Sequence, residues 1–218
     1  MKKLMDRLYD NIDEAKAFAL SFTNFVYFYD EYTPDDYLTT ICEECGREVQ
    51  CKDYLAPKSN CKKPTGLLCS INPGVSPELR EELIRTFDIT EDDFRPIRNK
   101  SGEIVYYQIT PQNVLLPIHD VNGWSVMEEC PKCGAKQYDG EWYDNEKDES
   151  YAFISQEALD NMHDLNILSE LIYPRHGTEY IISRRVYDFL TEKYPRTHYF
   201  PLFLKPEDDK QTGAGGAE

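Results

Sequence analysis

Four of the seven cysteines in this 218-residue chain occur in two copies of one short motif, Cys-X-X-Cys-Gly. The first copy contains Cys42 and Cys45, and the second contains Cys130 and Cys133. Two thiolates separated by two residues can reach one ion when the backbone curls between them, and a following glycine allows the positive φ that closes this curl. Four thiolates also complete the tetrahedral shell that zinc prefers. The sequence therefore predicts a structural zinc site with these four ligands and with no open position for catalysis.

Two other uses of the paired cysteines stay open. Four thiolates also suit iron, so a rubredoxin-like iron site is an alternative to zinc. A thioredoxin-like redox pair is less favoured, because neither motif stands at the start of a helix that follows a strand.

The other three cysteines, Cys51, Cys61 and Cys69, are spaced ten and eight residues apart and include no closely paired motif. We interpret them as free thiols, although a second metal site with a histidine or a nucleophilic thiol is also conceivable. A thiol enzyme needs a neighbouring histidine, and the four histidines show no recognisable signature: they are His119, His163, His176 and His198. The chain also lacks a glycine-rich phosphate loop, an HExxH motif and a GxSxG motif. We therefore expect a protein that is not an enzyme.

Strand-like segments flank both motifs. Residues 37–41 and 47–51 surround the first motif, and residues 124–129 and 135–140 surround the second. This layout predicts two β-hairpins whose tips face each other as a zinc ribbon. The ribbon would be split between about residues 37–52 and 121–140, with the intervening chain inserted into it. Such an insertion is tolerable, because the entropy of closing a loop grows slowly with its length.

The remaining elements are predicted from hydrophobic periodicity and from capping residues. They are an amphipathic helix over residues 3–19, a strand over 22–29, a helix that starts after Ser76, a strand over 103–109, and two strand–serine–helix units that begin at 153 and 181. Together these elements predict an α+β fold, with one domain over residues 1–205 and a flexible tail over 206–218.

The charge is strongly negative: 24 Lys and Arg against 40 Asp and Glu give a formal charge of −16. Such a field repels nucleic acids and anionic membrane surfaces, and it attracts basic proteins. No apolar run approaches the roughly 18 residues of a membrane span. The N-terminal residues carry Asp6 and Asp10 before any apolar run, unlike a signal peptide. These features predict a cytoplasmic protein with no membrane partner, and they disfavour nucleic acid as a partner.

With its two CXXCG motifs and the wide gap between them, the chain resembles the double-CXXCG motif proteins, a bacterial family known mainly from myxobacteria. The segment 164–192, DLNILSELIYPRHGTEYIISRRVYDFLTE, is also similar to the C-terminal stretch of that family. The resemblance covers about residues 37–204. The N-terminal helix and Cys51, Cys61 and Cys69 are not part of the family's pattern.

Some members of that family are assigned as immunity proteins of contact-dependent toxins. The resemblance thus implies a zinc-binding immunity protein that binds and neutralises a cognate toxin, and the acidic charge favours a toxin with a basic surface. The alternative is a zinc-ribbon adaptor that binds nucleic acid or a transcription complex. The acidic residues around both motifs disfavour this alternative, because it needs a basic patch there.

Overall fold

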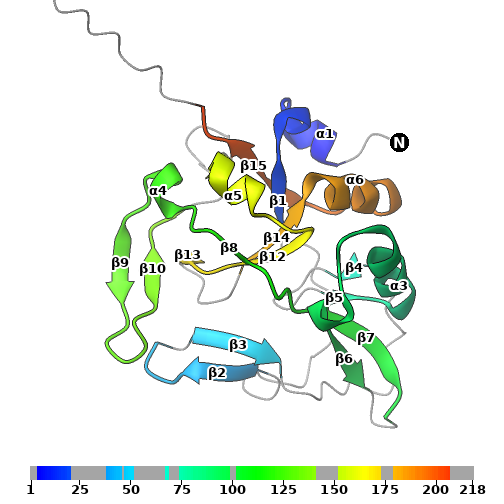
Figure 1. The fold of residues 1–218 in the computed structure, drawn as a ribbon, viewed down its shortest axis with the longest axis horizontal. Helices are drawn as coiled ribbons and strands as arrows, with labels where there is room; N and C mark the ends of the chain where they lie inside the picture. The colour runs from blue at the N-terminus through cyan, green and yellow to red at the C-terminus, as the bar shows by residue number, and fades with distance from the viewer. Residues whose placement is uncertain are drawn as a thin grey trace, which may run out of the picture.

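The computed structural model describes residues 4–20, 38–45, 47–51, 67–68, 74–98, 102–140, 152–172 and 179–206. Within these ranges the protein is a mixed α+β structure, mostly sheet with few helices, which confirms the α+β part of the predicted fold (Figure 1). The predicted strand 22–29 and nearly all of the predicted tail 206–218 lie outside the described residues.

A six-stranded mixed sheet forms the centre of the molecule. In spatial order its strands are β11 (Ala152–Ile154), β15 (Tyr199–Leu204), β1 (Ala17–Leu20), β14 (Tyr180–Ser183), β12 (Leu165–Leu168) and β8 (Val114–Leu115). The central strand β1 pairs antiparallel with both β14 and β15. The outer strands β11 and β8 add in parallel to β15 and β12. The sheet therefore joins segments from both ends of the chain.

Both faces of this sheet are buried. Alternate residues of β1 enter two different hydrophobic clusters: Phe18 and Leu20 belong to one, and Ala17 and Ala19 to the other. On the first face Phe18 stacks on Tyr187 with 3.6 Å between ring centroids. A strand covered on both faces needs apolar residues throughout, which is what residues 17–20 provide.

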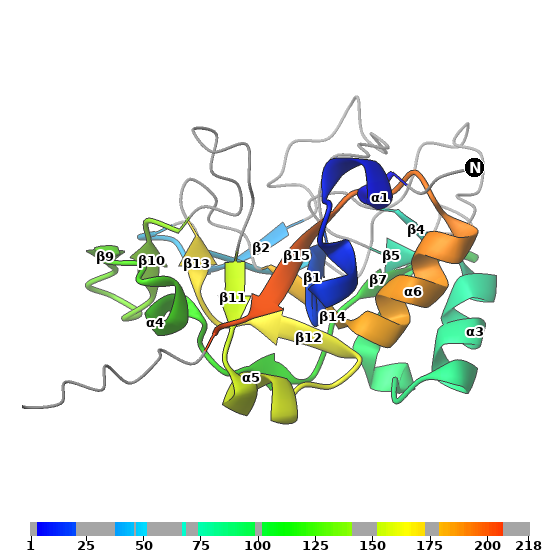
Figure 2. The ribbon, with the colours of Figure 1, turned by 90° about the horizontal axis from the view of Figure 1, so that it is seen from above.

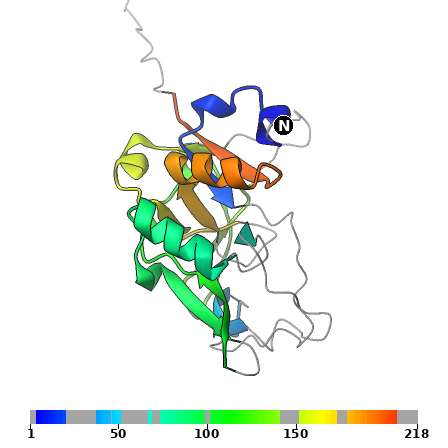
Figure 3. The same cartoon turned by 90° about the vertical axis from the view of Figure 1, so that its right-hand side faces the viewer.

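The helices lie on both faces of the sheet. They are α1 (Met5–Leu8), α3 (Pro77–Thr86), α4 (His119–Asn122), α5 (Gln156–Asp160) and α6 (Arg184–Lys193), with single 3₁₀ turns at Ile12–Glu14 and Glu91–Asp93. Helix α3 lies beside α6, where Lys193 Nζ is 2.6 Å from Glu82 Oε2 (Figures 2 and 3). Residues of α3 and α6 share the cluster of Phe18, and Ala158 of α5 joins the cluster of Ala17.

Three helices begin at the serines that the sequence identifies as caps. The hydroxyls of Ser76, Ser155 and Ser183 each accept a hydrogen bond from the backbone N–H three residues later, at 3.2, 3.0 and 3.3 Å. These bonds satisfy N–H groups that the first helical turn leaves without a partner. Both predicted strand–serine–helix units are confirmed, as β11 with α5 and β14 with α6.

A buried carboxylate ties the start of α6 to the end of the α3 segment. Asp164 accepts hydrogen bonds from the Ser183 hydroxyl at 2.5 Å, from the Asp88 N–H at 2.9 Å and from Arg185 Nε at 2.7 Å. Burial raises the pKa of Asp164, but the hydrogen bonds from Arg185, Ser183 and Asp88 outweigh burial and hold this pKa below its ordinary value.

Three smaller sheets surround the central one. A four-stranded sheet has the order β4 (Leu67–Leu68), β5 (Gly74–Val75), β7 (Ile104–Ile109) and β6 (Phe94–Arg98). A three-stranded sheet has the order β13 (Leu171–Ile172), β10 (Lys136–Tyr138) and β9 (Val126–Glu129). Strands β2 (Leu38–Cys42) and β3 (Arg47–Cys51) form the last sheet. The last two sheets carry the paired cysteines.

The predicted helix over residues 3–19 is wrong. Only Met5–Leu8 is α-helical, Ile12–Glu14 is a 3₁₀ turn, and Ala17–Leu20 is strand β1. The apolar residues of this segment have helical spacing, but residues 17–20 form a strand instead. In this position β1 makes backbone hydrogen bonds with both β14 and β15, which a helix could not make. Among the described residues no helix is long and apolar enough to cross a membrane.

Candidate metal centre

Each cysteine pair lies at one end of an antiparallel strand pair. The first hairpin is β2 with β3 and carries Cys42 and Cys45; the second hairpin is β9 with β10 and carries Cys130 and Cys133. Figure 1 shows the ends of the two hairpins next to each other.

In the second hairpin the backbone closes through Gly134, whose φ is 71°. The N–H of Gly134 donates to the carbonyl of Cys130 at 2.9 Å, and the N–H of Cys130 donates to the carbonyl of Ala135 at 2.9 Å. The positive φ expected after the second cysteine is thus confirmed at Gly134, while Gly46 lies outside the described residues.

The four cysteine sulfurs meet in one cluster. Cys42 Sγ lies 3.7 Å from Cys130 Sγ, Cys45 Sγ lies 3.8 Å from Cys133 Sγ, and all four sulfurs lie within 4.8 Å of one another. Zinc–thiolate bonds of about 2.3 Å place the sulfurs of a regular tetrahedron about 3.8 Å apart. The separations far exceed the roughly 2.05 Å of a disulfide bond. The cluster therefore has the dimensions of a tetrahedral metal site and could hold one ion.

The cluster is buried on one side and open on the other. Cys42 and Cys130 are 2% and 4% exposed, whereas Cys45 is partly exposed and Cys133 is exposed. Each hairpin contributes one sulfur to each side. An ion bound here would join both hairpins at the buried side and would still be accessible to chelators at the other.

The environment of Cys42 favours its thiolate, the form that binds metals. The backbone N–H groups of Cys45 and Glu44 donate to the Cys42 sulfur and, with the thiols of Cys130 and Cys133, lower the pKa of Cys42 to about 7, against the opposing effect of burial. These donors therefore stabilise the form of Cys42 that binds a metal.

The second hairpin is fastened to the body of the protein through β13. Strand β13 pairs in parallel with β10 and follows β12 of the central sheet after two residues. One of these two residues is Glu170, which is 4% exposed. Its Oε1 accepts from the N–H groups of Ile118 and His119 at 2.8 and 2.7 Å and lies 2.7 Å from His119 Nδ1. His119 in turn packs on Tyr138 of β10 with 4.4 Å between ring centroids.

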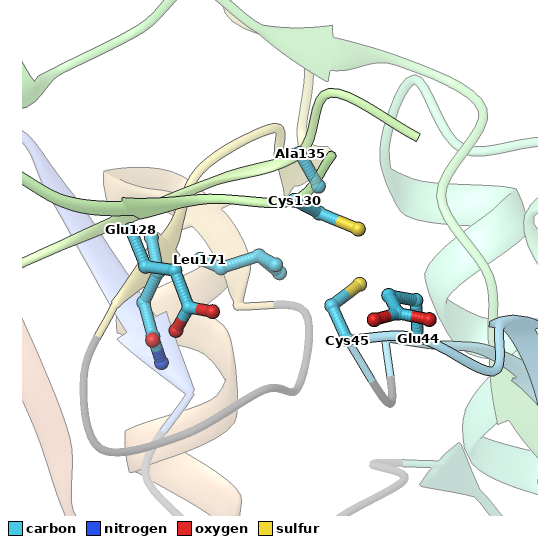
Figure 4. Close-up of a pocket in the computed structure, with 7 residues that line it drawn as sticks. Glu44, Cys45, Glu128, Cys130, Ala135 and Leu171 are labelled. Carbon is cyan, nitrogen blue, oxygen red and sulfur yellow. The ribbon is translucent and has the colours of Figure 1, made fainter. Parts of the chain in front are cut away.

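A cavity of about 280 Å³ opens beside the sulfur cluster. Its wall consists of Glu44, Cys45, Glu128, Cys130, Ala135, Gln137 and Leu171. Figure 4 shows the sulfurs of Cys45 and Cys130 pointing toward each other, Leu171 reaching toward them, and the carboxylates of Glu44 and Glu128 on either side. Both hairpins and β13 therefore contribute to one concave surface.

The structure brings together the four cysteines that the sequence singles out. Cys51 ends β3, and Cys61 and Cys69 lie outside the described residues, so their prediction as free thiols stays a prediction. Within the described part of the chain, the four-cysteine cluster is the one group of three or more metal-ligating side chains.

The described histidines lie in separate places. His119 contacts Glu170, His163 is exposed, and His198 lies 3.3 Å from the Tyr9 hydroxyl, where burial lowers the pKa of His198. His176 lies outside the described residues. Sequence reasoning did not identify Glu170 or Gln137, since neither belongs to a motif and their importance depends on strands that pair across long sequence separations.

Comparisons of the chain with protein-family models, with curated proteins and with solved structures found no match. The geometry and chemistry of the side chains must therefore carry the inference of function.

Proposed function

We propose that this protein is a non-enzymatic, zinc-binding immunity protein that binds and neutralises a cognate bacterial toxin with a basic surface. The observation that carries the zinc-binding part of the proposal is the cluster of four cysteine sulfurs, whose separations match a tetrahedral site. With four protein ligands such a site has no place for substrate or water, so its role is to hold the two hairpins together as a split zinc ribbon.

The distribution of charge supports a basic partner. The chain carries a formal charge of −16. The described exposed charges near the cysteines are Glu43, Glu44, Glu128 and Glu129 against Lys132 and Lys136. A surface of this sign speeds the approach of a cationic protein and repels nucleic acid. A basic substrate cleft on a nuclease toxin would be one surface that such an inhibitor could cover.

The resemblance to the double-CXXCG motif proteins supports the same proposal. Both motifs are complete, and the segment 164–192 contains β12, β13, β14 and α6, of which β13 pairs with β10 of the second hairpin. This resemblance is the source of the immunity role, while the cysteine geometry and the charge are independent of it.

The test begins with the gene next to this one, which we expect to encode a large secreted protein with a toxic C-terminal domain. Cells that express this domain should stop growing and should recover when the present protein is co-expressed. The purified pair should bind with an affinity that falls as salt is raised, because charge attraction between solvent-exposed surfaces is screened. Absence of both rescue and binding would refute the immunity role.

A parallel assay with duplex DNA and RNA separates this proposal from the zinc-ribbon adaptor. A salt-sensitive complex with nucleic acid, together with no binding to the neighbouring gene product, would replace immunity by the adaptor function.

A further inference from the structure

The cavity beside the sulfur cluster extends beyond the space that a metal ion would fill. Of the four cysteines only Cys45 and Cys130 line the cavity, so it extends from one side of the cluster. One ion fits between sulfurs that lie within 4.8 Å of one another. The cavity volume of about 280 Å³ is several times the roughly 30 Å³ that one water occupies in the liquid. Space for a side chain would therefore remain after metal binding.

Three side chains form a row across the floor of this cavity. Gln137 of β10 is the direct partner of Glu128 on β9 and of Leu171 on β13. Residues directly opposite on neighbouring strands project to the same face of a sheet, and all three of these residues line the cavity. Across the three strands, the row thus presents a carboxylate, an amide and an apolar side chain in this spatial order.

Gln137 supplies the observation that points to a ligand. The side chain is only 8% exposed, yet its Nε2 has no hydrogen-bond partner among the described residues. Buried polar groups in folded proteins are nearly always paired, because leaving one unpaired is unfavourable. An orphan donor in a cavity wall points to an acceptor from outside the described residues, and the neighbouring carboxylate of Glu128 favours a cation.

We propose that this cavity receives an arginine side chain of the protein partner, an inference that rests on the proposed function. The guanidinium binds the Glu128 carboxylate, the methylene groups lie on Leu171, and a main-chain carbonyl of the partner accepts a hydrogen bond from Gln137 Nε2. The planar guanidinium suits a carboxylate better than an ammonium does, because two parallel N–H groups can bind both oxygens.

The charge around the cavity favours the same ligand. Glu44 adds a second carboxylate on the wall formed by the first hairpin. A zinc ion bound by four thiolates carries a formal charge of roughly −2, so metal binding leaves the site anionic. The cavity therefore attracts a cation from three sides, while Leu171 accommodates the stem of the side chain.

The chain offers matched controls for this proposal. Glu129 follows Glu128 on β9 and so projects to the opposite face, where its Oε2 lies 3.9 Å from Lys136 Nζ. Glu43 precedes Glu44, is exposed and does not line the cavity. The variants Glu128→Gln and Glu129→Gln change the net charge equally, as do Glu44→Gln and Glu43→Gln. If the attraction is only a diffuse electrostatic one, the two variants of each pair should lose the same affinity. If the arginine binds in the cavity, the variant of the cavity residue should lose more.

The experiment is a titration of the zinc-loaded, isotope-labelled protein with N-acetyl-arginine methylamide, followed by NMR. The neutral citrulline analogue, which has nearly the same shape, is the control ligand. We expect the side-chain amide signal of Gln137 to shift with the arginine probe and to stay in place with citrulline. Glu128→Gln should weaken binding about tenfold, the loss expected for one charge-assisted hydrogen-bonded pair, and Glu129→Gln less than about twofold.

A Gln137→Met variant tests the second contact, since methionine has a similar size and no donor. It should weaken the arginine probe about fivefold while leaving the fold intact, because the change removes an unpaired buried group. Equal losses from Glu128→Gln and Glu129→Gln, equal binding of citrulline, or an unmoved Gln137 signal would each overturn the proposal.

These results separate the cavity from the proposed function. If a toxin partner is found and its affinity is unchanged by Glu128→Gln, the arginine assignment is wrong and the immunity role stands. If the arginine probe binds as described but the neighbouring gene product neither binds nor is neutralised, the cavity assignment is supported and the immunity role fails.

Discussion

Replacing one buried ligand, Cys130→Ser, tests whether a metal clamps the two hairpins together. Serine keeps the size of the side chain but is a poor zinc ligand, so the ion should be lost or held weakly. The paired cysteines of the two hairpins are 88 residues apart in the chain. In the chain-entropy model, a cross-link that closes a loop of this length stabilises the folded state by about 4–5 kcal/mol. We therefore expect the free energy of unfolding to fall by about 3–5 kcal/mol.

The assay combines metal analysis with urea unfolding. Purified protein should contain one zinc per chain, and Cys130→Ser should contain little. Unfolding can be followed by the fluorescence of Trp124, which packs against the cluster of buried residues around Ala17. The matched control is Cys61→Ser, the same substitution at a cysteine predicted to be a free thiol. It should leave both metal content and the unfolding midpoint unchanged.

Two results would refute the reasoning about the clamp. One is a Cys130→Ser variant with full metal content and an unchanged midpoint, which would show that Cys130 is not a ligand. The other is a wild-type protein that binds no zinc and whose unfolding is indifferent to a chelator. One iron per chain in place of zinc, with the same loss of stability, would keep the clamp and change the ion.

Three further predictions concern the body of the fold. Asp164→Ala should lower the free energy of unfolding by about 2–4 kcal/mol in urea titrations, because the buried Ser183 hydroxyl and the partly buried Asp88 N–H both lose their acceptor. Arg185→Gln should cost less than Asp164→Ala, because the Arg185 side chain is 63% exposed and both of these donors keep their acceptor. The pKa of Asp164 is lowered in the folded state, so the ionised carboxylate contributes its full stabilisation above the unfolded-state pKa of about 4. This stabilisation is lost as the pH falls below that value. Urea midpoints measured from about pH 5 to about pH 2 should therefore fall more steeply for the wild type than for Asp164→Asn. Gly74→Ala should lower the free energy of unfolding by about 1–3 kcal/mol, measured by heat or urea, since a Cβ at this position meets the Tyr106 hydroxyl and the Tyr107 carbonyl oxygen. An unchanged unfolding midpoint would mean that the neighbouring atoms move aside without cost.

Local signals in the sequence were sufficient where a residue acts on its near neighbours. Ser76, Ser155 and Ser183 were each placed correctly as helix caps, because the cap bond spans only three residues. The strand that ends in the first motif and the curl at Gly134 were predicted for the same reason. The clustering of the four cysteines was predicted in spite of its long range, since the two motifs are identical and tetrahedral coordination requires four ligands.

Local signals failed where distant segments decide the structure. Residues 17–20 have the apolar content of a helix face, but they form a strand because β14 and β15 provide backbone partners on both sides. Strand β15, which contains Pro201 opposite Phe18, was not anticipated for a similar reason. The row of Glu128, Gln137 and Leu171 depends on two strand pairings at once, and neither pairing has a sequence motif.

The two hairpins are fastened to the molecule in different ways, and this difference explains how a metal bound by the four cysteines would affect recognition of a partner. The second hairpin joins β13, which follows β12 of the central sheet after two residues and is fixed by the contacts of Glu170. Within the described residues, β2 and β3 of the first hairpin pair only with each other. The sulfur cluster is thus the described connection between the two hairpins, and it holds Glu44 and Cys45 against the wall formed by β9, β10 and β13. Loss of the metal would then remove one wall of the cavity while the other wall remained in place, so metal binding and partner binding should fail together.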